Sequence, residues 1–112
     1  MNFISVFAGL SLYNISMCYI QTGDLQRAIE FMLESLRVWQ TALPPGHQHI
    51  LLAEDMLRKF RNFLLESLRS LQTALPPGHQ DIRNAEDMLR YLEHAMQEGR
   101  GRSRGTGGCA LS

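Results

Sequence analysis

The residues of this chain that are best suited to chemistry are its histidines, its paired carboxylates and its cysteines. His47 and His49 stand two positions apart, a spacing that first suggests a metal site. A protein zinc site needs about four ligands from His, Cys, Asp or Glu. No Cys or acidic cluster adjoins the two histidines, and Asp81 replaces the second one when the segment recurs. We therefore predict no metal or other cofactor, and histidines that cap or pack against helices.

Two pairs of adjacent acids, Glu54-Asp55 and Glu86-Asp87, are the next candidates. General acid–base catalysis needs carboxylates in different environments that face one substrate. Both pairs fall on the polar side of amphipathic stretches, which is typical of a solvated helix face. The chain also lacks a nucleophile elbow and a Gly-rich phosphate loop. We therefore predict no catalytic residue and no enzymatic activity.

The two cysteines differ in setting. Cys109 begins the terminal tetrapeptide Cys-Ala-Leu-Ser, which fits a prenylation motif whose final Ser favours farnesyl transfer. The Gly-rich segment before it would expose the thiol, and nearby arginines would attract anionic lipid. Cys109 is thus a candidate lipidation site; the alternative is a tail that matches by chance. Cys18 lies in an apolar stretch, so we expect a buried thiol in a reducing compartment.

A direct repeat organises the elements that carry these residues. Residues 31–62 recur at 63–94 with 22 of 32 positions identical, including the octapeptide Thr-Ala-Leu-Pro-Pro-Gly-His-Gln. A unit of this length is usually too small to bury its own apolar face. Such units stack on neighbours, which indicates a helical-repeat interaction module.

Apolar residues spaced by three and four predict four helices and no strand. The expected helices cover residues 3–21, 25–43, 48–75 and 80–98, with stops at Gly23, at each Pro-Pro-Gly and at Gly99. One stripe crosses the repeat junction without a Gly or Pro: Ile50, Ala53, Leu57, Phe60, Leu64, Leu68, Leu71 and Leu75. It predicts a single helix about 40 Å long. The fold class is therefore all-α, with antiparallel helical hairpins joined by short loops.

Charge and composition divide the chain into a domain and a tail. Residues 1–98 carry 8 basic and 11 acidic side chains, whereas residues 99–112 carry three arginines and no acid. We assign residues 1–98 to one helical domain and 99–112 to a flexible, basic, Gly-rich tail. The acidic balance of the domain excludes a nucleic-acid footprint.

The first 20 residues contain no charged side chain and leave three interpretations open. A signal sequence would carry a basic segment at its start, but the first basic residue is Arg27. The length suits a membrane-spanning helix, yet asparagines and serines dilute its apolar character. A buried repeat helix is the reading that we favour.

Residues 9–43 resemble a tetratricopeptide repeat, a pair of helices with set large and small positions. The matching positions are Leu12 and Ile15 in the first helix, Tyr19 near its end, Gly23 in the turn, Ala28 at the helix crossing and Met32 in the second helix. Ser16 and Ser35 replace the small residues usual in the family. The resemblance implies that these positions pack the hairpin.

The loop Leu-Pro-Pro-Gly-His-Gln resembles the inter-repeat loop of long, kinesin-light-chain-type arrays, with His47 and His79 at the family's loop histidine. The second unit departs from the family because the turn expected before Phe63 is absent. Either a partial duplication fused two helices, or duplicated capping helices follow one hairpin.

Members of this family hold extended peptides in a groove, which makes Tyr13, Asn14 and Met17 the candidate groove residues here. The carboxylate clamp of some members is not expected, because Lys59 is the only lysine and Met17 stands where that clamp needs Asn.

These observations favour a non-enzymatic, cytoplasmic adaptor or scaffold. Its partner would be a protein, a peptide or a second copy, with no nucleic acid and with membrane contact only through a farnesyl group. The alternatives are a small membrane protein anchored by residues 1–20 and a non-functional array fragment.

Overall fold

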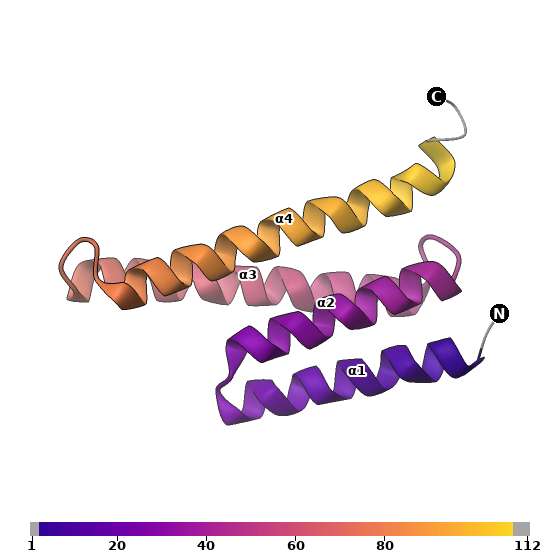
Figure 1. Ribbon diagram of the computed structural model, residues 1–112, viewed down its shortest axis with the longest axis horizontal. Coiled ribbons are helices and arrows are strands. Elements are labelled where there is room, and N and C mark those ends of the chain that lie inside the picture. The colour runs from indigo at the N-terminus through magenta and orange to yellow at the C-terminus, as the bar shows by residue number, and fades with distance from the viewer. Residues whose placement is uncertain (1–2, 109–112) are drawn as a thin grey trace.

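Four antiparallel helices build the molecule in a computed structural model that describes residues 3–108, with side chains described for residues 3–98. They are α1 (Phe3–Thr22), α2 (Leu25–Ala42), α3 (Gln48–Ala74) and α4 (Gln80–Gly108) (Figure 1). No strand occurs between residues 3 and 108. The predicted all-α class is confirmed, and so is the long helix that crosses the repeat junction.

The turn between α1 and α2 is short because both helix ends are capped locally. Gly23 adopts φ +85°, a left-handed conformation that ends a helix at little cost for glycine. The carboxylate of Asp24 accepts a hydrogen bond from the backbone N–H of Arg27 at 3.1 Å, which caps the start of α2. The two helices therefore fold back on each other as a hairpin.

The duplicated loops adopt the same backbone conformation. Leu43 and Leu75, which cap α2 and α3, both have φ −123° and ψ 153°. Gly46 and Gly78 have φ +84° and +82°. The repeat in sequence is thus a repeat in structure: each copy is a helix, a Pro-Pro-Gly loop and a second helix.

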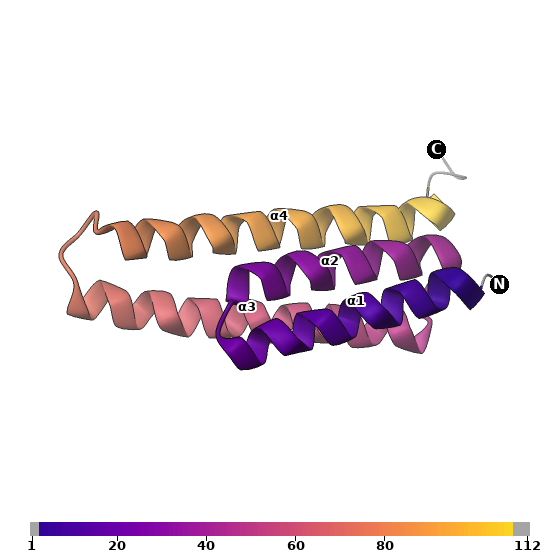
Figure 2. The same cartoon turned by 60° about the horizontal axis from the view of Figure 1, so that its bottom comes forward.

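The helix pairs differ in length, and the longer pair projects beyond the shorter one. α2 contacts α1, α3 and α4, whereas the main neighbour of α1 is α2 alone. Figures 1 and 2 show α3 and α4 running past the α1–α2 turn, with both chain ends at the opposite end of the molecule. α3 has 27 residues and α2 has 18. The difference of nine residues leaves an overhang of about 13 Å.

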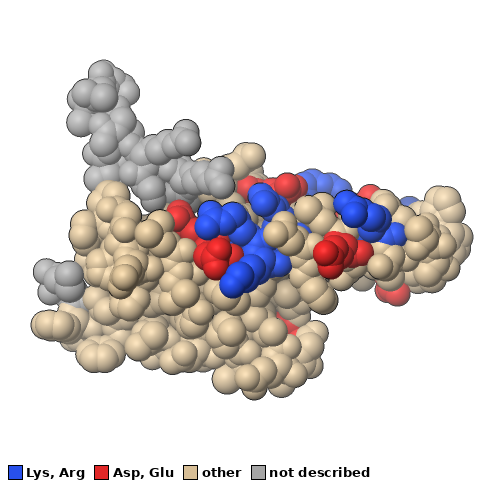
Figure 3. All heavy atoms as spheres, turned by 180° about the vertical axis from the view of Figure 1, so that it is seen from behind, with Lys and Arg blue, Asp and Glu red and all other residues tan. Residues whose placement is uncertain are grey.

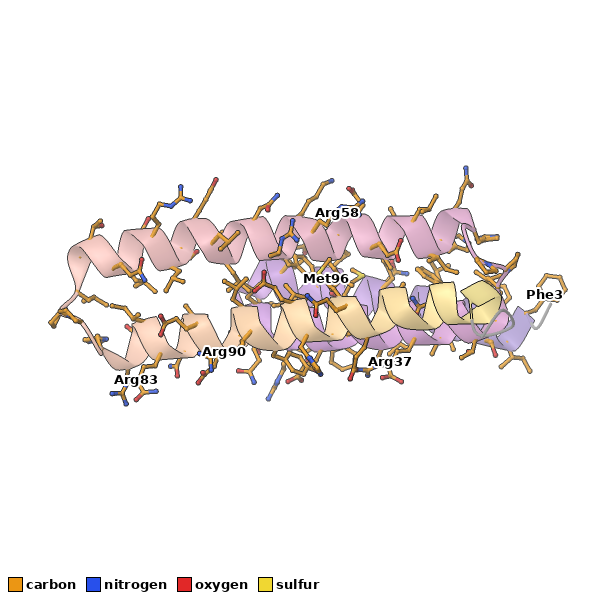
Figure 4. The ribbon with its side chains drawn as sticks, turned by 90° about the horizontal axis from the view of Figure 1, so that it is seen from above. Phe3, Arg37, Arg58, Arg83, Arg90 and Met96 are labelled. Atoms are coloured by element: carbon orange, nitrogen blue, oxygen red, sulfur yellow. The ribbon has the colours of Figure 1, made fainter. Side chains whose placement is uncertain are left out.

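One apolar core joins α2 to the first half of α3 and the second half of α4. Its buried members are Ala28, Ile29, Met32, Leu33, Leu36, Trp39, Leu43, Ile50, Ala53, Leu57, Phe60, Leu64, Leu92, Ala95 and Met96. In Figure 4 Met96 points from α4 toward α3, whereas Arg83 and Arg90 point away from it. Ile82 and Ala85 are buried in the overhang but lie outside this cluster.

Two expectations about helix ends and burial are wrong. The last helix does not stop at Gly99, because its backbone stays helical to Gly108 and glycine ends a helix only when it leaves helical dihedral angles. Cys18 is exposed rather than buried. Its helix has one main neighbour, so a large part of the circumference of α1 faces outward.

Candidate interaction surfaces

Small residues set the register of the α1–α2 hairpin. Ser35 donates its hydroxyl hydrogen to the backbone carbonyl of Gly9, with Oγ and O 2.7 Å apart. Seven residues further along each helix, in opposite directions, the hydroxyl of Ser16 donates to the carbonyl of Ala28. Gly9, Ser16 and Ser35 are all buried. A side-chain hydroxyl can reach the backbone of a neighbouring helix only where the helices approach closely, so the two bonds fix both spacing and register.

Trp39 ties this hairpin to α3. Its side chain is fully buried, and its indole Nε1–H donates to the backbone carbonyl of Val6 at 3.2 Å. The indole lies directly on Gly9, where an added Cβ would come within 2.2 Å of Nε1. On its other side the indole stacks on His49 of α3, with ring centroids 4.8 Å apart. A glycine at position 9 is therefore required by the close approach of the indole.

The positions that carry the family resemblance lie in different environments. Ala28 and Met32 are fully buried. Tyr19 is half-buried and stacks on Phe31 of α2, with centroids 5.5 Å apart. These three residues, together with the turn at Gly23, lie within the hairpin.

Leu12 and Ile15 lie further out than the resemblance implies. Leu12 is half-buried, and 40 % of Ile15 is exposed. Ser16, next to Ile15, is the residue of this turn that faces α2. Position 15 thus belongs to the uncovered side of α1.

The predicted groove residues Tyr13, Asn14 and Met17 do not gather into one groove. Tyr13 and Met17 are half-buried and pack against the core, and the Tyr13 ring lies 6.1 Å from that of Trp39. Asn14 is exposed. The first two are parts of a packed interface, and only Asn14 faces solvent.

The outer face of α1 is a large apolar surface. Exposed fractions are 72 % for Phe3, 79 % for Ile4 and 64 % for Phe7, and Leu10 and Ile15 extend the same surface. Figure 4 shows Phe3 projecting from the end of the molecule. On the face shown in Figure 3, charged side chains gather across the middle and upper part, while the lower part, where α1 lies in Figure 1, is almost entirely uncharged.

A second apolar surface lies on the overhang of α3. It is an open groove, which we call the α3 groove, lined by Phe63, Glu66, Ser67, Ser70, Leu71 and Ala74. Phe63 is 58 % exposed, and the neighbouring Leu65 is 38 % exposed. The predicted apolar stripe of α3 is therefore buried only in its first part, because Leu71 and Leu75 extend past the end of α2.

A cleft of about 600 Å³ lies between α2 and α4. It is lined by Gln26, Ile29, Glu30, Asn84, Asp87, Met88 and Tyr91. Asp87 forms an exposed ion pair with Arg90 at 3.5 Å. No group of three or more potential metal ligands exists among the described residues. The cleft is a surface feature of mixed polarity between two packed helices.

The loop histidines cap helices, as expected from the sequence. Nδ1 of His47 accepts a hydrogen bond from the N–H of His49 at 3.1 Å, at the start of α3. Nδ1 of His79 accepts one from the N–H of Asp81 at the same distance. The same cap therefore begins the second helix of each copy, and it replaces the acidic or hydroxyl side chain more common there.

The paired acids also lie where the sequence places them, on a solvated helix face. Asp55 forms ion pairs with Arg58 at 3.6 Å and with Lys59 at 3.3 Å. These contacts link residues three and four apart on one helix. Asp87 lines the cleft between α2 and α4, but the ion pair that it forms is with Arg90 of its own helix.

Cys109, the candidate lipidation site, lies outside the described residues.

Comparison with models of protein families, with curated proteins and with solved structures finds no match. The surfaces described above are therefore interpreted from their own geometry. The sequence predicts repeat units with an apolar surface for a neighbour, but sequence reasoning did not locate the residues of either surface, although the duplication held a signal for one of them. The α3 groove copies positions of α2 that face α1, and a comparison of the two copies position by position would have revealed it.

Proposed function

We propose that this chain is a non-enzymatic helical-repeat adaptor that acts by binding another protein in the cytoplasm. The observation that carries the proposal is the coverage of α1. Its apolar residues lie all around the helix, yet α2 is its only main neighbour. A helix that is apolar on every side is normally buried on every side, in a protein or in a bilayer.

The size of the uncovered apolar surface of α1 supports the proposal that a partner binds there. Soluble monomers rarely expose a contiguous apolar patch larger than a few hundred Å². Phe3, Ile4 and Phe7 are each more than 60 % exposed and lie within about one turn of one another. A helix of a second protein laid against them would complete a helical stack of the kind that repeat proteins form. The resemblance of residues 9–43 to a tetratricopeptide repeat points the same way.

A bilayer is the second candidate partner, because α1 is long and apolar enough to cross a membrane. Residues 3–22 carry no Asp, Glu, Lys or Arg, and 11 % of the most apolar window is buried in the fold. Insertion would require α1 to leave α2, breaking the hydrogen bonds from Ser35 and Trp39. The packed hairpin therefore favours the protein partner.

The two candidates are separated by Phe7→Asp, which places a charge on the outer face of α1. Gln21→Asp is the matched control, because it adds the same charge to an exposed position near the other end of α1. Both variants and the parent chain are assayed for cross-linked complexes in cells, for flotation with neutral phosphatidylcholine vesicles, and for helicity by circular dichroism.

For an adaptor, Phe7→Asp loses its cross-linked complexes, Gln21→Asp keeps them, and none of the proteins floats with vesicles. Flotation of the parent chain that Phe7→Asp abolishes would establish the membrane candidate instead. Equal complexes for all three proteins would contradict a role for this surface.

Farnesylation of Cys109 is part of the proposal and has its own test. Incubation with farnesyltransferase and farnesyl diphosphate should add one farnesyl group, seen by mass spectrometry, because the terminal tetrapeptide fits the motif. Cys109→Ser removes the thiol nucleophile and keeps Cys18, so it should gain no mass. An unmodified parent chain would contradict the assignment.

A further inference from the structure

The α3 groove occupies, in the second copy of the repeat, the surface that α1 covers in the first copy. Its lining residues Phe63, Ser67 and Leu71 correspond to Phe31, Ser35 and Trp39 by the shift of 32 positions. In the first copy each of these three touches α1: Phe31 stacks on it, and the other two donate hydrogen bonds to its backbone.

The correspondence holds in three dimensions as well as in sequence. Both copies end their first helix with the same dihedral angles at Leu43 and Leu75, and both begin the second helix with a histidine cap. Four of the six groove positions are identical between the copies; Ser70 and Leu71 replace Val38 and Trp39. The same helix surface is thus presented twice.

Only the first copy has its covering helix. Trp39 is fully buried where Leu71 is half-buried, and Ser35 is fully buried where Ser67 is half-buried. Figures 1 and 2 show no element of the described chain on this side of the overhang, because α1 and α2 end before it. The chain thus has one α1 and two copies of the surface that α1 covers. In the second copy Leu64, which corresponds to Met32, is already buried in the core, so the uncovered part of this surface is the α3 groove.

Each chain has two such surfaces but only one α1, which argues against the α1 of a second copy as the occupant. If two chains exchanged their α1 helices, two helices would still face four surfaces. Moving the α1 of another copy from its own α2 into the α3 groove would uncover that α2, with no net burial. Exchange of α1 helices therefore cannot fill the groove, and we take a helix of a different protein as its occupant.

The chemistry of the groove describes that occupant. Leu71, Ala74 and the ring of Phe63 call for an apolar helix face. The Ser67 hydroxyl makes no hydrogen bond within the described residues, although Ser35 donates to a helix carbonyl. A small residue on the partner helix would expose such a carbonyl. Leu71 lacks the indole that forces glycine at position 9, so alanine or serine would also fit.

We propose that the α3 groove binds an uncharged apolar helix of a partner protein, antiparallel to residues 63–74, as α1 binds α2. This rests on the proposed adaptor function and names its partner's chemistry. The probe is a synthetic peptide of residues 3–22 with terminal lysines for solubility, titrated into the full chain with a fluorophore on the peptide.

Trp39 distinguishes the two surfaces, because it is the only tryptophan in the chain and lies under α1. Binding at the α3 groove should raise peptide anisotropy and leave Trp39 fluorescence unchanged. Leu71→Asp should weaken binding at least tenfold. Glu54→Gln, a polar change outside the groove, should leave it unchanged. A change in Trp39 fluorescence in step with binding would show displacement of α1 and overturn the proposal.

A gain-of-function variant provides a more specific test of the groove. Leu71→Trp restores the residue of the first copy and should strengthen binding of the peptide about tenfold, through one added indole hydrogen bond and its apolar contact. A peptide with Gly9→Leu should lose this gain, because its side chain meets the new indole, yet it should still bind the parent groove.

Failure of both peptides to bind any variant would overturn the groove proposal and leave the α1 test of the adaptor function unaffected. The final measurement is the oligomeric state of the chain without peptide, determined by sedimentation. A dimer that Leu71→Asp dissociates would show that a second copy fills the groove, which also contradicts the proposal.

Discussion

At the scale of single residues, the hairpin depends on hydrogen bonds from side chains to the backbone of the opposite helix. Ser35 is fully buried, so its hydroxyl would be unsatisfied without the carbonyl of Gly9. A buried polar group without a partner costs about 1–3 kcal/mol, which makes the pairing of these helices specific as well as stable.

Replacement of Ser35 by alanine should therefore lower the free energy of unfolding by about 1 kcal/mol, because the Gly9 carbonyl loses its extra donor. Ser67→Ala is the matched control, since the same residue in the second copy is half-buried and has no such bond within residues 3–98. It should change the free energy by less than about 0.5 kcal/mol. Urea unfolding followed by circular dichroism measures both, and equal losses would contradict the assignment.

Gly9→Ala tests the close approach of the Trp39 indole. The added methyl group would lie within 2.2 Å of Nε1, so the buried ring must move, at a cost of about 1–3 kcal/mol. Alanine regains about 1 kcal/mol of helix propensity. On a Trp39→Leu background the clash disappears, and the same change should become neutral or stabilising. Additive effects in this double-mutant cycle would show that the indole does not explain the glycine.

At the scale of helices, the periodicity of apolar residues predicted the elements well. The number of helices, the Pro-Pro-Gly loops and the unbroken α3 all follow from local rules about spacing and helix stops, and the structure confirms them. Burial was harder to predict, because spacing shows which face of a helix is apolar and not whether a neighbour covers it. Cys18 and Ile15 lie in an apolar helix and are nevertheless exposed.

The continuity of α3 can be tested at Asn62, the last residue of the first copy. This residue is exposed in the middle of the helix, so Asn62→Pro removes a backbone donor without removing a core side chain. It should cost about 3 kcal/mol or more and reduce helicity. Asn62→Ala should preserve or slightly raise stability, because alanine favours helix. If proline were tolerated there, the junction would be a turn and the fused helix would be wrong.

At the scale of the whole molecule, the duplication produced unequal halves. The first copy is enclosed by α1 and by the end of α4. The second copy joins the main core only through Leu64 and Leu92, and its overhanging part has Ile82 and Ala85 as its buried apolar residues. Elements with few buried contacts open locally at lower free energy than the rest of a domain. The overhang should therefore be the least protected part of α3.

Amide hydrogen exchange can compare the two copies at equivalent positions. Leu36 and Leu68 are both flanked by Ser and Arg, so their intrinsic exchange rates match and a difference in rate reports the structure. Leu36 is 3 % exposed and Leu68 is half-buried. We expect Leu68 to exchange at least tenfold faster, a difference of about 1.4 kcal/mol in opening free energy. Equal protection would mean that the overhang is stabilised as one unit with the core, and an uncovered groove would then not weaken it.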